Sequence, residues 1–139
     1  MIAFQIGGED ADFVRITITG DNQDGWLLAD VEVSAGRFRV RYDASFDTRA
    51  FSEFARQLKT LHQTVSGSAS FTSLERQLEL TLTCSSLGRI SVRGEAMDEA
   101  GTGNKLLFKL GIEFDQTHLP EILESLNAML KKHPERPFC

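Results

Sequence analysis

Residues with reactive or ligand-binding side chains are scattered along this sequence, and none stands in a catalytic spacing. The segment from Gly101 to Lys105 has the glycines and the lysine of a phosphate-binding loop, but Asn104 separates glycine from lysine and a strand pattern follows. A phosphate loop requires glycine directly before the lysine, between a strand and a helix. We therefore interpret residues 98–104 as a hairpin loop.

The histidines and cysteines give no signal of a metal site or a nucleophile. His62, His118 and His133 have no ligand spacing, and the sequence contains neither a Cys-x-x-Cys pair nor a calcium loop. Cys84 continues an apolar alternation, which favours a buried and inert thiol. Cys139 follows two prolines, and we expect it to be exposed. We predict no catalytic residues, no metal and no cofactor.

Negative charge and an aromatic residue together mark a candidate binding surface. The net charge is −5, and residues 1–30 contain six acidic residues and a single arginine. An acidic chain without a basic stripe is a poor nucleic-acid binder, so we expect a basic protein partner instead. The predicted contact residues are those of two acidic loops and the tryptophan after the first: Asp21, Asp24, Trp26, Glu95, Asp98 and Glu99. The alternatives are a merely solubilising acidic surface and a tryptophan that packs under a loop.

A row of arginines follows the third predicted strand. Arg37, Arg39 and Arg41 share one face of the next segment, opposite Asp30 and Glu32 on the strand before it. Opposite charges on neighbouring strands attract, so this pattern predicts cross-strand ion pairs. An anion site or partner site is the alternative.

Two kinds of periodicity alternate along the chain. Apolar residues recur at every second position in eight segments, which predicts strands with one buried and one wet face. These segments are 2–6, 14–18, 27–33, 38–42, 69–71, 78–84, 90–96 and 106–114. Apolar spacings of three and four predict two amphipathic helices. The first spans 47–65, with Asp47 or Thr48 as its cap and Gly67 as its stop, and the second spans 119–130, with Thr117 as its cap.

The order of these elements predicts the fold class. Four strands, a helix, four strands and a second helix follow one another, and the connections are too short for parallel crossovers. We expect an α+β fold with a curved, mainly antiparallel sheet of about eight strands and both helices on one face. The helix residues predicted to be buried are Phe51, Phe54, Leu58, Leu61, Leu119, Ile122, Leu123 and Leu126, and their predicted partners are Leu78, Leu80, Phe108, Leu110 and Ile112. We expect residues 1–139 to form one domain, with 134–139 as a short C-terminal tail.

No targeting or membrane segment is recognisable in the sequence. Residues 1–6 lack the basic region and the long apolar run of a signal peptide. No stretch approaches the ~20 apolar residues of a transmembrane helix. We therefore expect a cytoplasmic chain that contacts no membrane.

Four stretches of the sequence are similar to those of one known family. An acidic turn from Asp21 leads into the strand that opens Trp26-Leu27, and a helix opens Asp47-Thr48. A Leu-x-Leu strand precedes Gly88-Arg89-Ile90-Ser91-Val92-Arg93-Gly94. Phe108-x-x-x-Ile112-Glu113-Phe114-Asp115-Gln116-Thr117-x-Leu119 then runs into the last helix. On these stretches the chain resembles the small bacterial immunity proteins of the WapI type.

The resemblance implies a non-enzymatic protein that binds another protein. Such proteins protect the producing cell by binding a contact-delivered toxin, often a nuclease. Two other functions stay open: a small-molecule or regulatory binding module with a pocket between sheet and helices, and a hydrolase of unrecognised type. A large secreted toxin encoded immediately upstream would favour the immunity function over both.

Overall fold

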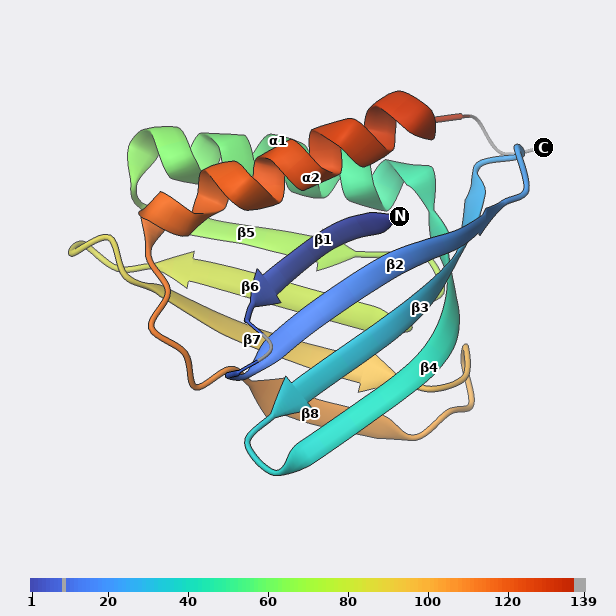
Figure 1. Cartoon of the computed structure of the whole chain (residues 1–139), viewed down its shortest axis with the longest axis horizontal. Helices are drawn as coiled ribbons and strands as arrows, with labels where there is room; N and C mark the ends of the chain where they lie inside the picture. The colour runs from blue at the N-terminus through green and yellow to red at the C-terminus, as the bar shows by residue number, and fades with distance from the viewer. Residues whose placement is uncertain (9, 137–139) are drawn as a thin grey trace.

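The chain forms four strands, a helix, four more strands and a second helix (Figure 1). The structure is a computed structural model that describes residues 1–8 and 10–136, so the expected exposure of Cys139 lies outside the described residues. The first half contains β1 (Ile2–Gly7), β2 (Phe13–Asp21), β3 (Trp26–Ala35), β4 (Phe38–Asp47) and α1 (Thr48–Thr64). The second half contains β5 (Gly67–Thr72), β6 (Leu78–Cys84), β7 (Ile90–Met97), β8 (Lys105–Lys109), a 3₁₀ turn (Gln116–His118) and α2 (Leu119–Lys132). The predicted α+β class and the predicted order are confirmed.

The strands form two antiparallel sheets of four, with the orders β1-β2-β3-β4 and β5-β6-β7-β8. Figure 1 shows the first sheet in front of the second, with the strands of both sheets facing each other. A single continuous sheet would require β4 to pair with β5. Helix α1 begins directly after β4 and carries the chain away from the edge of that strand, so β5 starts a second sheet.

Both helices lie together on one side of the two sheets. Helix α1 packs on the edge strand β5, α2 packs on the edge strand β1, and the helices pack on each other (Figure 1). The helix residues predicted to be buried are buried, except Leu123, which is half-buried. Among their predicted partners Leu78, Leu80 and Leu110 are buried, whereas Phe108 and Ile112 are half-buried.

Phenylalanine rings fill the centre of the core. Phe4, Phe46, Phe51, Phe54 and Phe71 are fully buried and contact one another, with ring centroids 5.1–6.4 Å apart. They come from β1, β4, α1 and β5, so one aromatic cluster joins both sheets to the first helix. Edge-to-face and tilted ring pairs of this kind stabilise a core beyond their buried area.

The ends of α1 follow from two local contacts. The carboxylate of Asp47 accepts a hydrogen bond from Ala50 N at 3.1 Å, which makes Asp47 the N-cap. At the other end Val65 adopts a left-handed conformation, with φ of 52°, and its N–H donates to Leu61 O. The predicted stop at Gly67 is therefore two residues late, because Val65 takes the role that glycine usually has.

The predicted strand over 106–114 is wrong in its length. Strand β8 ends at Lys109, and the chain then forms an irregular connector over 110–115. The connector keeps partial contact with β7, since Leu110 N donates to Val92 O and Ile90 N donates to Phe114 O. The cap also differs from the prediction: Asp115, whose carboxylate accepts Thr117 N at 2.9 Å, caps the 3₁₀ turn before α2.

Candidate functional site

The acidic turn predicted to bind a partner is the β2–β3 hairpin. Asp21 ends β2, Trp26 begins β3, and Asn22 N donates to Trp26 O at 3.1 Å. Asp21 Oδ1 accepts Gln23 N at 2.7 Å, and Asp24 Oδ1 accepts Trp26 N at 3.2 Å. Both predicted contact carboxylates therefore also shape the turn, as Asp side chains commonly do.

The hairpin is attached to the ends of both helices. Thr48 N, at the start of α1, donates to Gly25 O at 2.9 Å. His133, just after α2, places Nδ1 2.7 Å from Asp21 Oδ2, and these two side chains are only 14% and 18% exposed. The hydrogen bond from His133, followed by that from Gln23 N, holds the pKa of Asp21 below its ordinary value.

Trp26 lies on the outer face of the first sheet, as its position in the alternation predicts. It is half-buried, and it alternates along β3 with buried residues such as Leu27 and Ala29. Leu28 follows on the same outer face and is 42% exposed. An aromatic residue beside an exposed leucine is a common composition for the centre of a protein interface.

A hollow of about 550 Å³ opens next to this face. The β7–β8 hairpin supplies Asp98 and Glu99 to its lining, and the first sheet supplies Leu28 and Asp43. The other lining residues are Thr19, Ala29, Ala44, Ser45, Gln77 and Ala100, so no lysine or arginine is among the lining residues that the structure describes. We call this feature the acidic hollow. Asp98 and Glu99 therefore line the same hollow as Leu28, which is two residues after Trp26 in β3, although about 70 residues separate them from Leu28 in sequence.

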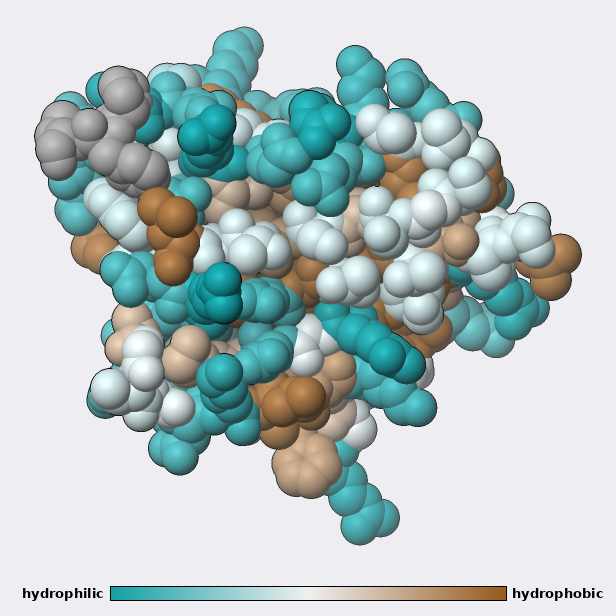
Figure 2. All heavy atoms as spheres, turned by 180° about the vertical axis from the view of Figure 1, so that it is seen from behind, coloured by the Kyte–Doolittle hydropathy of each residue, from teal (hydrophilic) through white to brown (hydrophobic). Residues whose placement is uncertain are grey.

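Glu95 lies apart from the other predicted contact residues. It faces outward from β7 in the second sheet, where its Oε1 lies 3.1 Å from Lys105 Nζ. Figure 2 shows this rear face, whose middle is a pale zone between charged groups. The outward residues of β5, β6 and β7 there are mostly hydroxyl side chains: Ser68, Ser70, Thr72, Thr81, Thr83 and Ser91. Glu95 therefore borders an uncharged surface instead of joining the acidic hollow.

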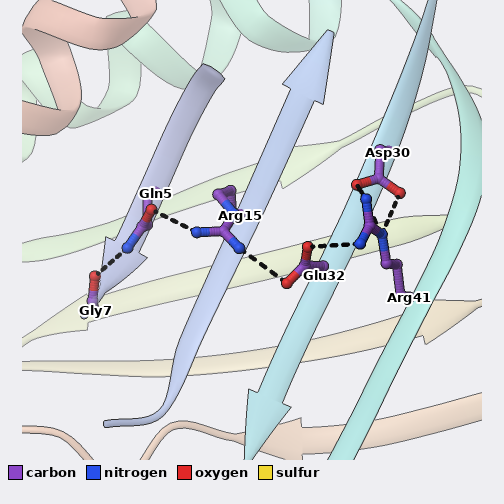
Figure 3. Close-up of polar contacts among 6 residues, drawn as sticks. All are labelled: Gln5, Gly7, Arg15, Asp30, Glu32 and Arg41. Atoms are coloured by element: carbon purple, nitrogen blue, oxygen red, sulfur yellow. Dashed lines mark hydrogen bonds and ion pairs between the residues drawn. The ribbon is translucent and has the colours of Figure 1, made fainter. Parts of the chain in front are cut away.

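Arg41, the last residue of the arginine row, forms part of a polar ladder across the outer face of the first sheet (Figure 3). Arg41 Nη2 lies 3.1 Å from Asp30 Oδ2, and Arg41 Nη1 lies 3.6 Å from Glu32 Oε1. These distances confirm the predicted cross-strand ion pairs for this arginine. Arg15 on β2 extends the ladder, with Nη2 2.9 Å from Glu32 Oε2 and Nη1 donating to Gln5 Oε1 (Figure 3). Within the described part of the chain, Arg37 and Arg39 have no carboxylate partner.

A second hollow, of about 440 Å³, lies where the connector passes between β1 and α2. Its walls come from β1 and the turn after it, from connector residues such as Phe114, and from His118 and Glu121 at the start of the second helix. The ring of His118 stacks on Phe114 with centroids 5.1 Å apart, and its Nδ1 lies 3.3 Å from Asp115 Oδ1. A binding module with a pocket between sheet and helices is one of the alternative functions that the sequence leaves open. This hollow is the feature of the structure that corresponds to such a pocket.

Among the residues that the structure describes, the remaining reactive side chains do not gather at one place. Cys84 is buried in the hydrophobic core, and its thiol donates to Ser85 O at 3.5 Å. Over residues 1–8 and 10–136 no three side chains of His, Cys, Asp or Glu gather as metal ligands. In the same residues no helix has both the length and the apolar character to cross a membrane. Residues 98–104 form the β7–β8 hairpin loop, as predicted.

Sequence reasoning missed three residues of this site. Leu28 belongs to the predicted strand 27–33 without any predicted role, and Asp43 lies just beyond the predicted strand 38–42, which in the structure continues to Asp47. From the sequence, His133 is only a histidine without ligand spacing, and nothing in the sequence pairs it with Asp21, 112 residues away.

Comparison with known proteins identifies the family. The model of the immunity protein WapI-like family matches residues 5–134, which include all elements from β2 to α2. No curated protein matches the chain. The chain therefore belongs to the immunity protein WapI-like family.

Proposed function

We propose that this chain is a non-enzymatic immunity protein that binds and neutralises a cognate bacterial toxin, and that the toxin is a nuclease. Membership of the family supports an immunity function. The acidic hollow beside Trp26 is the observation that supports the chemistry of the partner. The proposal places this chain in the cytoplasm, where it meets the toxin after delivery.

The charge of the acidic hollow fits the active site of a nuclease. A nuclease binds phosphates with lysine and arginine side chains, and its cleft is therefore basic. Asp43, Asp98 and Glu99 are exposed, and no lysine or arginine is among the described lining residues, although Arg41 interacts with Asp43 from outside the hollow. An acidic surface of this kind attracts a basic cleft and speeds association. Once bound, it occupies the place of the nucleic acid.

The proposed contact surface extends beyond the hollow. A specific interface buries about 800 Å² on each partner, which is more than one hollow provides. Trp26 and Leu28 supply an apolar centre next to the hollow, and Asp24 lies in the adjoining turn. In this arrangement Asp21 shapes the hairpin, and Glu95 stays outside the contact.

Neutralisation by occupancy predicts a fixed stoichiometry. The experiment uses the toxic domain of the proposed cognate toxin and measures residual toxin activity while the chain is added. Inhibition should reach its end point at one chain per toxin, and the two proteins should elute as one complex. Protection at a small fraction of one equivalent would instead indicate turnover, and its loss in a folded Cys84→Ser variant would identify an enzyme.

The second candidate is a small-molecule or regulatory binding module. The hollow of about 440 Å³ between β1, the connector and α2 supports it, because ligand pockets have volumes of about 300–1,000 Å³. A thermal-shift screen with a metabolite panel tests this candidate. A ligand that raises Tm for the parent and not for a folded Phe114→Ala variant would favour it over the immunity function.

A further inference from the structure

One hydrogen bond between side chains joins the proposed contact surface to the end of the second helix. His133 Nδ1 and Asp21 Oδ2 are 2.7 Å apart, and both side chains are more than four-fifths buried. The backbone N–H of His133 donates to Met129 O, so the ring is held by the last turn of α2. A charge-assisted hydrogen bond that is shielded from water is stronger than an exposed ion pair.

The partner of His133 sits at the base of the β2–β3 hairpin. Asp21 pairs with Leu27 across the two strands, and its other oxygen accepts Gln23 N inside the turn. Trp26 follows this turn directly, with its N–H donated to Asp24. A change in the position of Asp21 therefore shifts the turn, and with it Asp24 and Trp26 of the proposed contact surface.

We infer that His133 is a positioning residue for partner binding: its ring fixes Asp21, and through Asp21 it fixes the orientation of Asp24 and Trp26 toward the partner. The inference rests on the proposed function. His133, which follows α2, would thus orient the proposed contact surface without itself contacting the partner.

The chain itself provides a probe for this inference, because Trp26 is its only tryptophan. In the free protein, acrylamide quenching of tryptophan fluorescence reports how well Trp26 is held against the sheet. Replacing His133 by Ala removes the hydrogen bond to Asp21, and quenching should increase. His133→Asn keeps an N–H donor near the place of Nδ1, and quenching should stay close to that of the parent.

Partner binding gives the second measurement, with a catalytically inactive variant of the cognate toxin domain as the probe. Loss of a hydrogen bond to a charged group lowers an equilibrium constant roughly tenfold or more. His133→Ala should therefore dissociate from the toxin domain about ten times faster than the parent. His133→Asn should restore most of the parental rate. Leu126→Ala, which removes buried volume from the same helix, controls for general loss of stability. It should lower Tm without changing quenching at 25 °C or dissociation.

The outcomes separate the inference from the proposed function. If Trp26→Ala speeds dissociation and His133→Ala does not, the inference is wrong and the proposed surface stands. If neither variant changes dissociation, the proposed surface is wrong, and the inference falls with it. An equal effect of His133→Ala and Leu126→Ala on quenching and dissociation would also overturn the inference, since it would reduce the role of His133 to stability.

Discussion

The carboxylate of Asp12 accepts a hydrogen bond from the backbone N–H of Gly111, with 2.6 Å between Oδ2 and N. Its other oxygen accepts the N–H of Gly36 at 2.9 Å. One side chain in the turn between β1 and β2 therefore holds both the β3–β4 turn and the connector that leads to α2. This contact explains why the chain leaves the second sheet after Lys109, although the apolar alternation continues to Phe114.

Asp12→Ala should destabilise the protein measurably. The variant exchanges the hydrogen bonds of Gly36 and Gly111, both exposed, for bonds to water, and we expect a loss of about 1 kcal/mol in the free energy of unfolding. Urea unfolding measures it. Asp10→Ala, an exposed neighbour in the same turn, is the control and should change the free energy by less than ~0.5 kcal/mol. Equal effects of the two variants would mean that the two hydrogen bonds contribute no net stability.

Leu80→Ala and Phe108→Ala should differ in their cost. Leu80 is 1% exposed, so its truncation should lower the free energy of unfolding by about 2–5 kcal/mol. Phe108 is half-buried near the open edge of the second sheet, and its truncation should cost less than the ~3–5 kcal/mol of a fully buried phenylalanine. Urea unfolding of both variants, with m-values compared, checks the difference. A full-sized loss for Phe108→Ala would show that its ring is covered in solution.

Much of the fold could be predicted because each local pattern agrees with the final packing. The alternation along β2, β3, β6 and β7 has one apolar face, and that face is buried in each strand. The alternation predicted burial wrongly where a residue's exposure depends on tertiary contacts. Phe38 was predicted to point inward and is 66% exposed, because it stands beside the β3–β4 turn, which projects past β8 in Figure 1. The division into two sheets depends on where α1 directs the chain, and periodicity carries no information about that direction. The single-domain organisation stays a prediction.

The candidate site could be predicted only in part, for a related reason. Acidic residues and Trp26 were visible as neighbours in sequence, and the β2–β3 hairpin keeps them together. The closeness of Asp98 to Leu28 depends on how the two sheets face each other, so sequence spacing could not reveal it. Glu95 shows the opposite relation between sequence and structure. It is near Asp98 in sequence, but it lies on the outer face of the second sheet, where Lys105 already pairs with it.

The Asp21–His133 pair should make stability depend on pH in the acidic range. The pKa of Asp21 lies below its ordinary value of 3.8 because His133 and Gln23 N donate to the charged carboxylate. Such a group stabilises the fold fully above its unfolded pKa, and this stabilisation is lost as pH falls through the lowered, folded value. Asp21→Asn should therefore be less stable than the parent at pH 5, and the difference should shrink as pH falls below 3.8. Urea unfolding of both proteins over this range checks it; a difference that stays constant with pH would contradict it.

The proposed contact surface predicts separate effects on association and dissociation. Asp21 and Asp24 are unsuitable for this test, since their carboxylates also shape the turn. Asp43 and Glu99 are better choices, because their side chains line the acidic hollow and both are exposed. Asp43→Asn with Glu99→Gln should slow association with the toxin domain several-fold and weaken its dependence on salt, since charge acts mainly on encounter. Trp26→Ala should leave association nearly unchanged and raise the dissociation rate, since a desolvated anchor acts after docking.

The matched control removes the same amount of charge elsewhere. Glu121→Gln with Glu124→Gln lowers the negative charge by the same two units on the exposed side of α2, far in sequence from the acidic hollow. If association with the toxin responds only to net charge, both double variants should slow it equally. A selective effect of Asp43→Asn with Glu99→Gln would place the basic cleft of the toxin at the acidic hollow. If that double variant and Trp26→Ala both bind and protect like the parent, the partner contacts another face. Arg37 and Arg39, which are exposed at the start of β4 beside the paired Arg41, are then the next residues to replace.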